Sequence, residues 1–243
     1  MEKLADHLWI QSQPLVMPGG VALGTRMAVF KLENGHLLVY SPVKLTESLQ
    51  TELNSLGEVK YIIAPNPFHH LYVNAYLKAY PEASLYCTAK LIKKRPDLKD
   101  AIILRPEQKY PWSSSLQGLL LQSSHLDEYV LYHLESKTLV ITDLMMNLPK
   151  GTNWKENFAL NVLGVNGKPV VSRLVRLILG KHESVKRAIQ EILTWDFDRI
   201  FLTHGSVIET DGKNIFQNNQ YLWRNAVKPR RVHRVACNGF MVE

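Results

Sequence analysis

Two adjacent histidines, His69 and His70, follow a short apolar run and are the residues best placed to do chemistry. The run, residues 59–64, is typical of a buried strand, and Pro65 and Pro67 prevent that strand from continuing. Loops at the carboxyl ends of strands carry the chemistry of α/β proteins, and neutral imidazole is the commonest protein ligand for zinc. The loop therefore predicts a metal site, provided that other segments supply further ligands.

Three other metal-capable side chains follow short apolar runs in the same way: His125, Asp143 and His204. With the histidine pair they offer several imidazoles and one carboxylate, a set of ligands that suits zinc, iron or manganese. Each has an ordinary alternative, because a lone loop histidine usually makes hydrogen bonds and an aspartate after a strand usually belongs to a turn or cap. Four separate apolar runs that are each followed by a metal-capable side chain are hard to attribute to chance. The spacing of these residues alone, however, does not identify a known family of metal sites.

Glu128 and His133 are additional candidates for the same pocket. Both lie in a predicted strand over residues 128–134, where their opposite parity points them to opposite faces of the sheet. They can line one pocket together only if a bulge intervenes. Glu128 lies near the start of the strand and could reach the same edge as His125.

Strands and helices alternate along the chain, which favours a layered α/β domain over an all-β sandwich. A helix over residues 45–56 has Thr46 placed as its N-cap and Gly57 as its stop. Residues 146–167 contain Pro, Gly and Asn without firm periodicity, which predicts a loop or a lid over the site. The other expected helices are 71–80, 170–179 and 182–193, and the expected strands are 8–10, 25–32, 36–40, 59–64, 84–87, 118–122, 128–134, 137–142 and 199–202.

The composition is that of a globular protein with a basic surface. The 243 residues carry a formal net charge of +7, and basic residues cluster at residues 90–95 and 228–234. Such clusters are usually solvated surface, although they can also meet an anionic substrate or an acidic partner. This distribution argues against nucleic acid as a partner for most of the chain.

Neither a membrane segment nor a secretion signal is indicated. No apolar run approaches the roughly 20 residues that span a bilayer, and residues 1–6 include acidic side chains and lack a signal core. Cys87 and Cys237 lie far apart and are expected to be free thiols. We therefore predict a cytoplasmic protein without a membrane partner, and no pattern indicates its oligomeric state.

Several segments together resemble the metallo-β-lactamase superfamily, and within it the DUF4336 family. The resemblance covers roughly residues 4–210 and implies a four-layer αββα sandwich that holds one or two zinc ions at the sheet edge, usually for hydrolysis. The segments that carry it are Gly24-Thr25-Arg26-Met27, Tyr40-Ser41-Pro42, Pro65-Asn66-Pro67-Phe68-His69-His70-Leu71, residues 136–144 and Thr203-His204-Gly205.

The chain departs from the superfamily at its first metal motif, His-x-His-x-Asp-His. If the final histidine of that motif is His70, then Pro65 and Pro67 replace two histidines and His69 replaces the aspartate. Proline has no side-chain ligand, so the resemblance implies a first site that keeps at most His125. It also implies a second site of His69, His70 and His204, with Asp143 matching the acid that bridges the two sites.

We expect residues 1–220 to form one metallo-β-lactamase-like domain and residues 221–243 to form a basic C-terminal tail. The expected function is that of a metal-dependent hydrolase with at most a mononuclear site, in which Asp143 orients or deprotonates the attacking water. The cofactor would be zinc, or iron or manganese, or none, and the substrate a small or anionic molecule. The alternative is a catalytically inactive relative that acts as a binding or scaffold protein.

Overall fold

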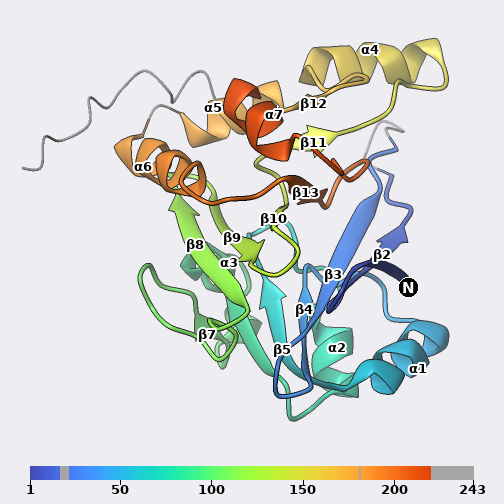
Figure 1. Ribbon diagram of the computed structural model, residues 1–243. Helices are drawn as coiled ribbons and strands as arrows, with labels where there is room; N and C mark the ends of the chain where they lie inside the picture. The colour runs from blue at the N-terminus through green and yellow to red at the C-terminus, as the bar shows by residue number, and fades with distance from the viewer. Residues whose placement is uncertain (17–21, 181, 220–243) are drawn as a thin grey trace, which may run out of the picture.

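Two β-sheets pack face to face, and helices cover both outer faces (Figure 1). The computed structural model describes residues 1–16, 22–180 and 182–219. This arrangement is the four-layer αββα sandwich expected from the sequence, and the fold prediction is confirmed. The predicted basic tail, residues 221–243, and Cys237 within it lie outside the described residues.

The first sheet has the strand order β1-β2-β3-β4-β5-β6-β7. Strands β1 to β4 pair antiparallel, and β4 to β7 pair parallel. The strands are β1 (Glu2–Ala5), β2 (Leu8–Gln13), β3 (Thr25–Lys31), β4 (His36–Tyr40), β5 (Glu58–Ala64), β6 (Ser84–Cys87) and β7 (Ile102–Ile103). The helices that accompany them are α1 (Glu47–Leu56), α2 (Val73–Ala79), α3 (Ala89–Lys94) and the short 3-10 helix η1 (Pro96–Leu98).

The second sheet has the strand order β13-β10-β9-β8. Strands β10 and β13 run parallel and in register from Thr138 opposite Arg199 to Ile141 opposite Leu202. The loops that follow these two strands therefore leave the sheet side by side. The elements are β8 (Leu116–Gln122), β9 (Asp127–His133), β10 (Thr138–Ile141), β13 (Arg199–Leu202), α5 (Arg173–Leu179), α6 (Glu183–Ile192) and α7 (Gly212–Asn219).

The side chains of β3 alternate between two hydrophobic cores, one on each face of the first sheet. Met27 and Val29 face the helical layer and share a core with Leu53 of α1. Ala28 and Phe30 face the second sheet and pack in the core between the sheets. Successive side chains of a strand point to opposite faces, so a strand covered on both faces is apolar at every position rather than at every second one.

The structure differs from the sequence prediction between residues 146 and 172. The predicted helix over residues 170–179 begins only at Arg173, after Ser172 as its N-cap, because Val170 belongs to a short strand, β12 (Pro169–Val170). That strand pairs with β11 (Met146–Asn147). The segment predicted to be a loop or lid also contains a helix, α4 (Trp154–Leu163).

The Asn and Gly residues around α4 are helix caps rather than loop residues. The Asn153 side chain accepts a hydrogen bond from the Glu156 backbone N–H, and Gly164 ends the helix with a φ of +75°. We call residues 146–170, which comprise β11, α4 and β12, the cap. It lies at the upper right of Figure 1 and has a small core of its own, formed by Leu148, Leu160, Val165 and Val170.

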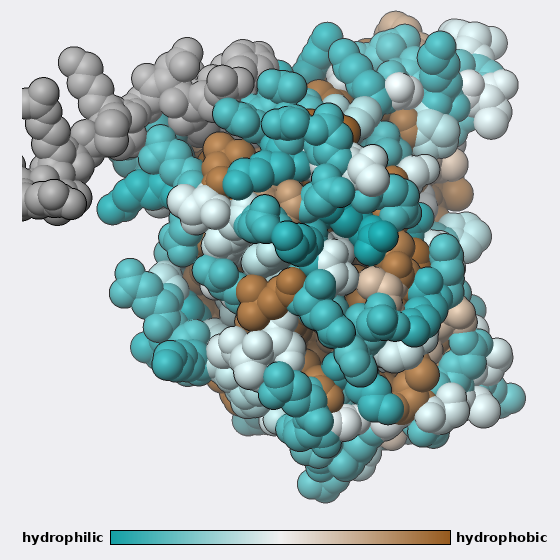
Figure 2. All heavy atoms as spheres, viewed as in Figure 1, coloured by the Kyte–Doolittle hydropathy of each residue, from teal (hydrophilic) through white to brown (hydrophobic). Residues whose placement is uncertain are grey.

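Hydrophobic residues reach the surface in separate patches among hydrophilic ones on the face shown in Figure 2, including some below α4 on the right of the view. None of the described helices is long and apolar enough to cross a membrane. Cys87 is a buried free thiol, and burial raises its pKa to about 12. A thiol with such a pKa is unreactive, so this cysteine serves packing.

Candidate metal centre

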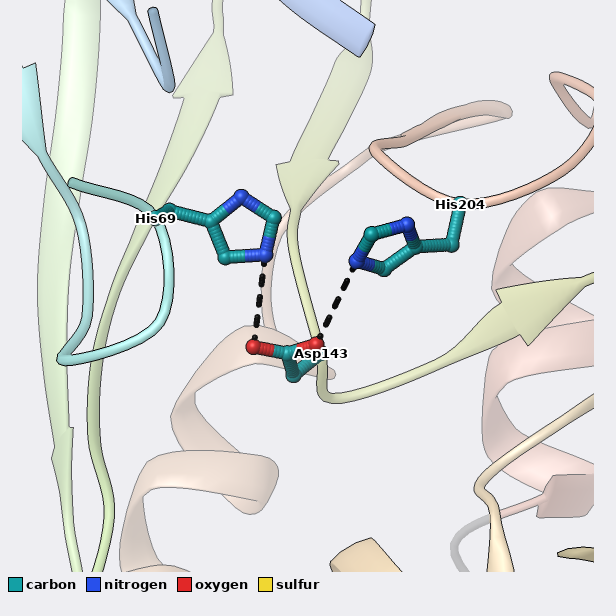
Figure 3. Close-up of side chains that lie close together, drawn as sticks. All are labelled: His69, Asp143 and His204. Atoms are coloured by element: carbon teal, nitrogen blue, oxygen red, sulfur yellow. Dashed lines mark ion pairs between the residues drawn. The ribbon is translucent and has the colours of Figure 1, made fainter. Parts of the chain in front are cut away.

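His69, Asp143 and His204 lie together at the edge where strands of both sheets end (Figure 3). They follow β5, β10 and β13 respectively, and all three are buried. Asp143 Oδ2 lies 3.4 Å from His69 Nε2, and Asp143 Oδ1 lies 3.5 Å from His204 Nε2. One ligand atom from each residue lies within 4.8 Å of the other two. We call these three residues the triad.

The separations within the triad suit ligands of one ion better than direct hydrogen bonds. An N–H···O hydrogen bond joins atoms about 2.7–3.2 Å apart, which is shorter than either separation. Two ligand atoms that are each about 2.1 Å from a tetrahedral zinc ion lie about 3.4 Å from one another. Each imidazole therefore lies from one oxygen of the carboxylate at the separation of two ligands of one ion.

A backbone carbonyl group just before β3 determines which ring nitrogen of His204 carries the proton. Nδ1 of His204 lies 2.7 Å from the carbonyl oxygen of Gly24. A carbonyl oxygen only accepts, so Nδ1 carries the proton and the neutral ring presents a lone pair on Nε2, the atom nearer Asp143. Metal-binding histidines are oriented in this way by a carbonyl or carboxylate on the other ring nitrogen.

The loop of His204 requires a glycine. Gly205 has a φ of +89°, and a Cβ at this position would lie 2.0 Å from the carbonyl oxygen of Asn147. Asn147 also holds the loop through two backbone hydrogen bonds, one to His204 and one from Ser206. Arg26 donates to the carbonyl oxygens of Leu202 and Gly205 from the other side.

We call residues 65–72, between β5 and α2, the histidine loop. Asn66 joins this loop to Asp143. Its side-chain oxygen accepts hydrogen bonds from the backbone N–H groups of Phe68 and His69, and its Nδ2 donates to Asp143 Oδ2 at 2.7 Å. Nδ1 of His69 lies 2.9 Å from the Ser41 hydroxyl, which can accept the ring proton and leave Nε2 free. Both Asn66 and Ser41 belong to segments that carry the family resemblance, but sequence reasoning assigned neither of them a role.

Glu128 holds the backbone of the loop that contains Asp143. Its buried carboxylate accepts hydrogen bonds from three successive backbone N–H groups, those of Thr142, Asp143 and Leu144, at 2.7, 3.0 and 2.9 Å. Burial and the nearby charge of Asp143 raise the pKa of Glu128 to about 7. Both oxygens are occupied by the loop backbone, so this candidate supports the site and does not belong to the triad.

Asp143 is the charged member of the triad. Burial alone would raise its pKa, but the interactions of its two oxygens with the facing rings of His69 and His204 outweigh burial and hold the pKa of Asp143 below its ordinary value. The carboxylate therefore stays ionised at neutral pH, and a cation between it and the imidazoles would meet a negative charge.

His70 lies beside the triad but outside it. Its Nδ1 lies 3.0 Å from a guanidinium nitrogen of Arg95, and a guanidinium can only donate. The neutral ring then carries its proton on Nε2 and has no second lone pair for a metal. Burial and the charges of Lys94 and Arg95 lower the pKa of His70, which favours this neutral form.

The remaining candidates lie elsewhere on the structure. His125 is exposed in the turn before β9, where its backbone N–H donates to Ser123. His133 is at the far end of β9, with its ring against Phe30 and its Nδ1 2.7 Å from the Ser136 hydroxyl. Neither joins the triad, and within residues 1–16, 22–180 and 182–219 no other three such side chains come as close together.

We call the loops that follow β5, β10 and β13, which carry the triad, the strand-end loops. The triad opens into a cavity of about 580 Å³ between these loops, the cap and α5. His70 and Lys94 line the same cavity, as do Thr25 and Ser172. Most of the remaining wall is aliphatic or aromatic. A cavity of this size lies within the range of about 300–1,000 Å³ that is usual for small-molecule sites.

The profile of one protein family, described as "Domain of unknown function (DUF4336)", matches residues 5–153. That match includes His69 and Asp143, and His204 lies beyond it. No curated protein sequence matches the chain.

Solved structures match over almost the whole chain. The metallo-β-lactamase FIM-1 from Pseudomonas aeruginosa, in a mono-zinc form, is 11% identical, with a TM-score of 0.61 and coverage of 91% of this chain and 93% of that one. A metallo-β-lactamase from Pontibacter korlensis is 14% identical, with a TM-score of 0.62 and coverage of 92% and 97%. A putative diflavin flavoprotein A 5 fragment from Nostoc sp. PCC 7120 is 13% identical, with a TM-score of 0.63 and coverage of 91% and 93%. At these identities the likeness shows the fold alone.

Proposed function

The chain belongs to the DUF4336 family and has the metallo-β-lactamase fold, and from that premise we propose that it is a hydrolase with one metal ion held by the triad. The observation that carries this proposal is the spacing within the triad, 3.4 and 3.5 Å from Asp143 to the two imidazoles. The proton position of His204, fixed by Gly24, supports it because it leaves the nitrogen nearer the carboxylate free to bind a metal.

The donor set fits a catalytic metal centre. Two imidazoles and one carboxylate are the three protein ligands of many catalytic zinc sites, which keep a fourth position for water or substrate. The same set suits iron(II), and manganese accepts the carboxylate. We propose zinc, with iron and manganese as the alternatives. Pro65 and Pro67 offer no ligands for a second ion, so the proposed site is mononuclear.

A bound ion would supply Lewis acidity and a water molecule whose pKa is lowered toward 7. The chain supplies the surroundings of that water. Asp143 is ionised, so it can accept a hydrogen bond from the water and orient it, and Asn66 holds the carboxylate in place. His70 and Lys94 line the cavity and carry N–H groups that can donate to a developing oxyanion. The reaction class is hydrolysis of an ester, amide or phosphoester.

Metal analysis of the full chain tests this proposal. Protein purified and then loaded with zinc, iron(II) or manganese should retain about one equivalent after desalting. His69→Ala, His204→Ala and Asp143→Asn should each lose most of it. His7→Ala, an exposed histidine outside the cavity, is the matched control and should retain the parent's metal. His125→Ala tests whether that residue adds a ligand.

The second candidate function is that of a non-catalytic binding protein, which the loss of two first-site ligands to Pro65 and Pro67 favours. Hydrolysis assays on the loaded protein separate the two candidates. A panel of nitrophenyl acetates, anilides and phosphates should show turnover that disappears in His204→Ala. Stoichiometric metal without turnover on any substrate class would favour the binding protein, and absence of metal binding would remove the hydrolase.

A further inference from the structure

Apart from the triad, the cavity is largely an apolar chamber. Its walls include Met146 and Val165 from the cap and Val175 and Ile178 from α5. Of these, Val165 and Val175 are buried, so they are fixed parts of the wall rather than surface residues. A chamber with such walls is unfavourable to fill with water alone and suits a hydrocarbon group.

The rim of the cavity is also apolar. Phe68 and Leu71 from the histidine loop are 52% and 63% exposed, and Leu174 from α5 is 52% exposed. All three line the cavity, so they surround its opening rather than lying scattered over the surface. Large apolar side chains that gather at the mouth of a cavity mark a ligand-binding site.

One positive charge completes the rim. Lys94 lines the cavity, where its Nζ donates to the carbonyl oxygen of Pro67 at 2.7 Å and lies 5.3 Å from the centre of the Phe68 ring. Apart from the triad carboxylate, no acidic side chain in the described part of the chain lines the cavity. The site therefore offers an apolar chamber, an apolar rim and a cationic group beside the metal ligands.

From these features we propose that the substrate is an anionic amphiphile, a fatty-acyl ester whose hydrocarbon chain occupies the chamber and whose anionic end faces Lys94. The proposal rests on the hydrolase function proposed above. In the reaction, the oxygen of water bonds to the acyl carbon and the acyl–oxygen bond breaks. The alcohol leaves with one proton of the water, and the fatty acid is released as a carboxylate with loss of the other.

The cavity argues against two other substrate classes. A polyanion such as nucleic acid needs several basic side chains along its path, whereas Lys94 is the one Lys or Arg lining the cavity among the described residues. A small hydrophilic substrate would leave most of the chamber wall without a partner. A chain with an anionic end satisfies both parts of the site.

Binding of a fluorescent fatty acid, cis-parinaric acid, to the full chain treated with EDTA tests the proposal without metal or turnover. We expect saturable binding that oleate displaces and butyrate does not. Leu174→Glu should weaken binding at least tenfold, because it places a carboxylate at the rim. Leu177→Glu is the matched control, since Leu177 is 79% exposed on the same helix but does not line the cavity. It should bind as the parent does.

A second pair of variants tests the charge. Lys94→Gln should weaken binding of oleate more than that of the uncharged oleyl alcohol, whereas Lys93→Gln, exposed and outside the cavity, should change neither. Absence of saturable binding, or equal loss in Leu174→Glu and Leu177→Glu, would overturn the proposal. Binding that survives in His204→Ala while metal is lost shows that chamber and metal site are separable. The failure of one proposal can thus be told from that of the other.

Discussion

The strand-end loops and the cap lie on either side of one cavity and are built in opposite ways. In the loops each member of the triad has a further partner: Gly24 holds His204, Asn66 holds Asp143, and Ser41 contacts His69. These partners come from segments far apart in the sequence, so the loops are tied into both sheets. Such ties keep ligands close to one geometry, which chemistry requires.

The cap, in comparison, is tied to the His204 loop through Asn147, and the rest of it depends mainly on a few side chains of its own. Leu160 is the one buried residue of α4, whereas Trp154 and Phe158 on the same helix are 74% and 67% exposed. Elements with few buried apolar contacts open at lower free energy than the domain as a whole. The comparison indicates a rigid side that would hold the metal and a more easily opened side that would admit substrate.

The largest effect should come from Glu128→Leu, which removes the acceptor for three backbone N–H groups under Asp143. Buried donors without acceptors each cost about 1–3 kcal/mol, so with three of them the free energy of unfolding should fall by at least about 3 kcal/mol. Metal retention should fall too. Chemical denaturation measures the first and metal analysis the second. Glu128→Gln, which keeps one accepting oxygen, should be intermediate, and unchanged stability in Glu128→Leu would show that the loop finds other acceptors.

Gly205→Ala should have the next largest effect, because its Cβ would overlap the Asn147 carbonyl and displace His204. The control is Gly35→Ala, which has a similar φ of +82° but no atom within 4 Å of its Cβ. Both variants carry backbone strain of roughly 1–3 kcal/mol, so the difference between them measures the overlap alone. Chelator competition should show weaker metal binding in Gly205→Ala and none of this loss in Gly35→Ala.

In the cap, Leu160→Ala should act locally. Truncating a buried leucine usually costs about 2–5 kcal/mol, and we expect the low end of that range here because the cap core is small. Hydrogen exchange should accelerate over residues 154–163 and stay unchanged in β10. Phe158→Ala, on the exposed part of the same helix, should change neither region. Faster exchange in β10 would mean that the cap and the sheets unfold together, and it would contradict the inference that the cap opens more easily than the strand-end loops.

The sequence predicted those elements whose signals are local. The Thr46 side chain caps α1 and Gly57 ends it, as expected, because each signal concerns only a few neighbouring residues. Helix α4 was not predicted for two reasons. Its large apolar residues, such as Trp154, are exposed to solvent. Its caps are Asn153 and Gly164, and both residue types are also common in loops. Periodicity reveals a helix only where one face is buried.

The sequence could not separate the two adjacent histidines. It predicted both His69 and His70 as ligands, because both follow the same strand. In the structure a hydroxyl contacts one ring and a guanidinium donates to the other, and these partners, Ser41 and Arg95, lie 28 and 25 residues away in the chain. The protonated ring nitrogen is set by such tertiary contacts, so spacing along the chain carries no information about it.

The smallest expected effect lies at the far end of β9, away from both the triad and the cap. His133 is 2% exposed, and burial lowers its pKa; the charge of His7 adds to this, and that of Glu135 opposes it. Histidine in the unfolded chain titrates near 6.5, so on acidification the unfolded state takes up this proton before the folded state does. Stability from His133 is therefore complete above about pH 6.5 and is lost as pH falls below it.

His133→Gln removes this titration and keeps a side chain that can reach the Ser136 hydroxyl. The free energy of unfolding of the EDTA-treated parent should fall more between pH 7.5 and 5.5 than that of the variant. EDTA removes the acid sensitivity of the proposed metal site, which would otherwise dominate, since imidazole binds metal only when neutral. Other titrating groups are common to both proteins and cancel. Parallel profiles would mean that the charge of Glu135 offsets burial, so that the pKa of His133 is the same in the folded and unfolded chain. A larger separation in metal-loaded protein than in EDTA-treated protein would mean that this end of β9 is coupled to the triad after all.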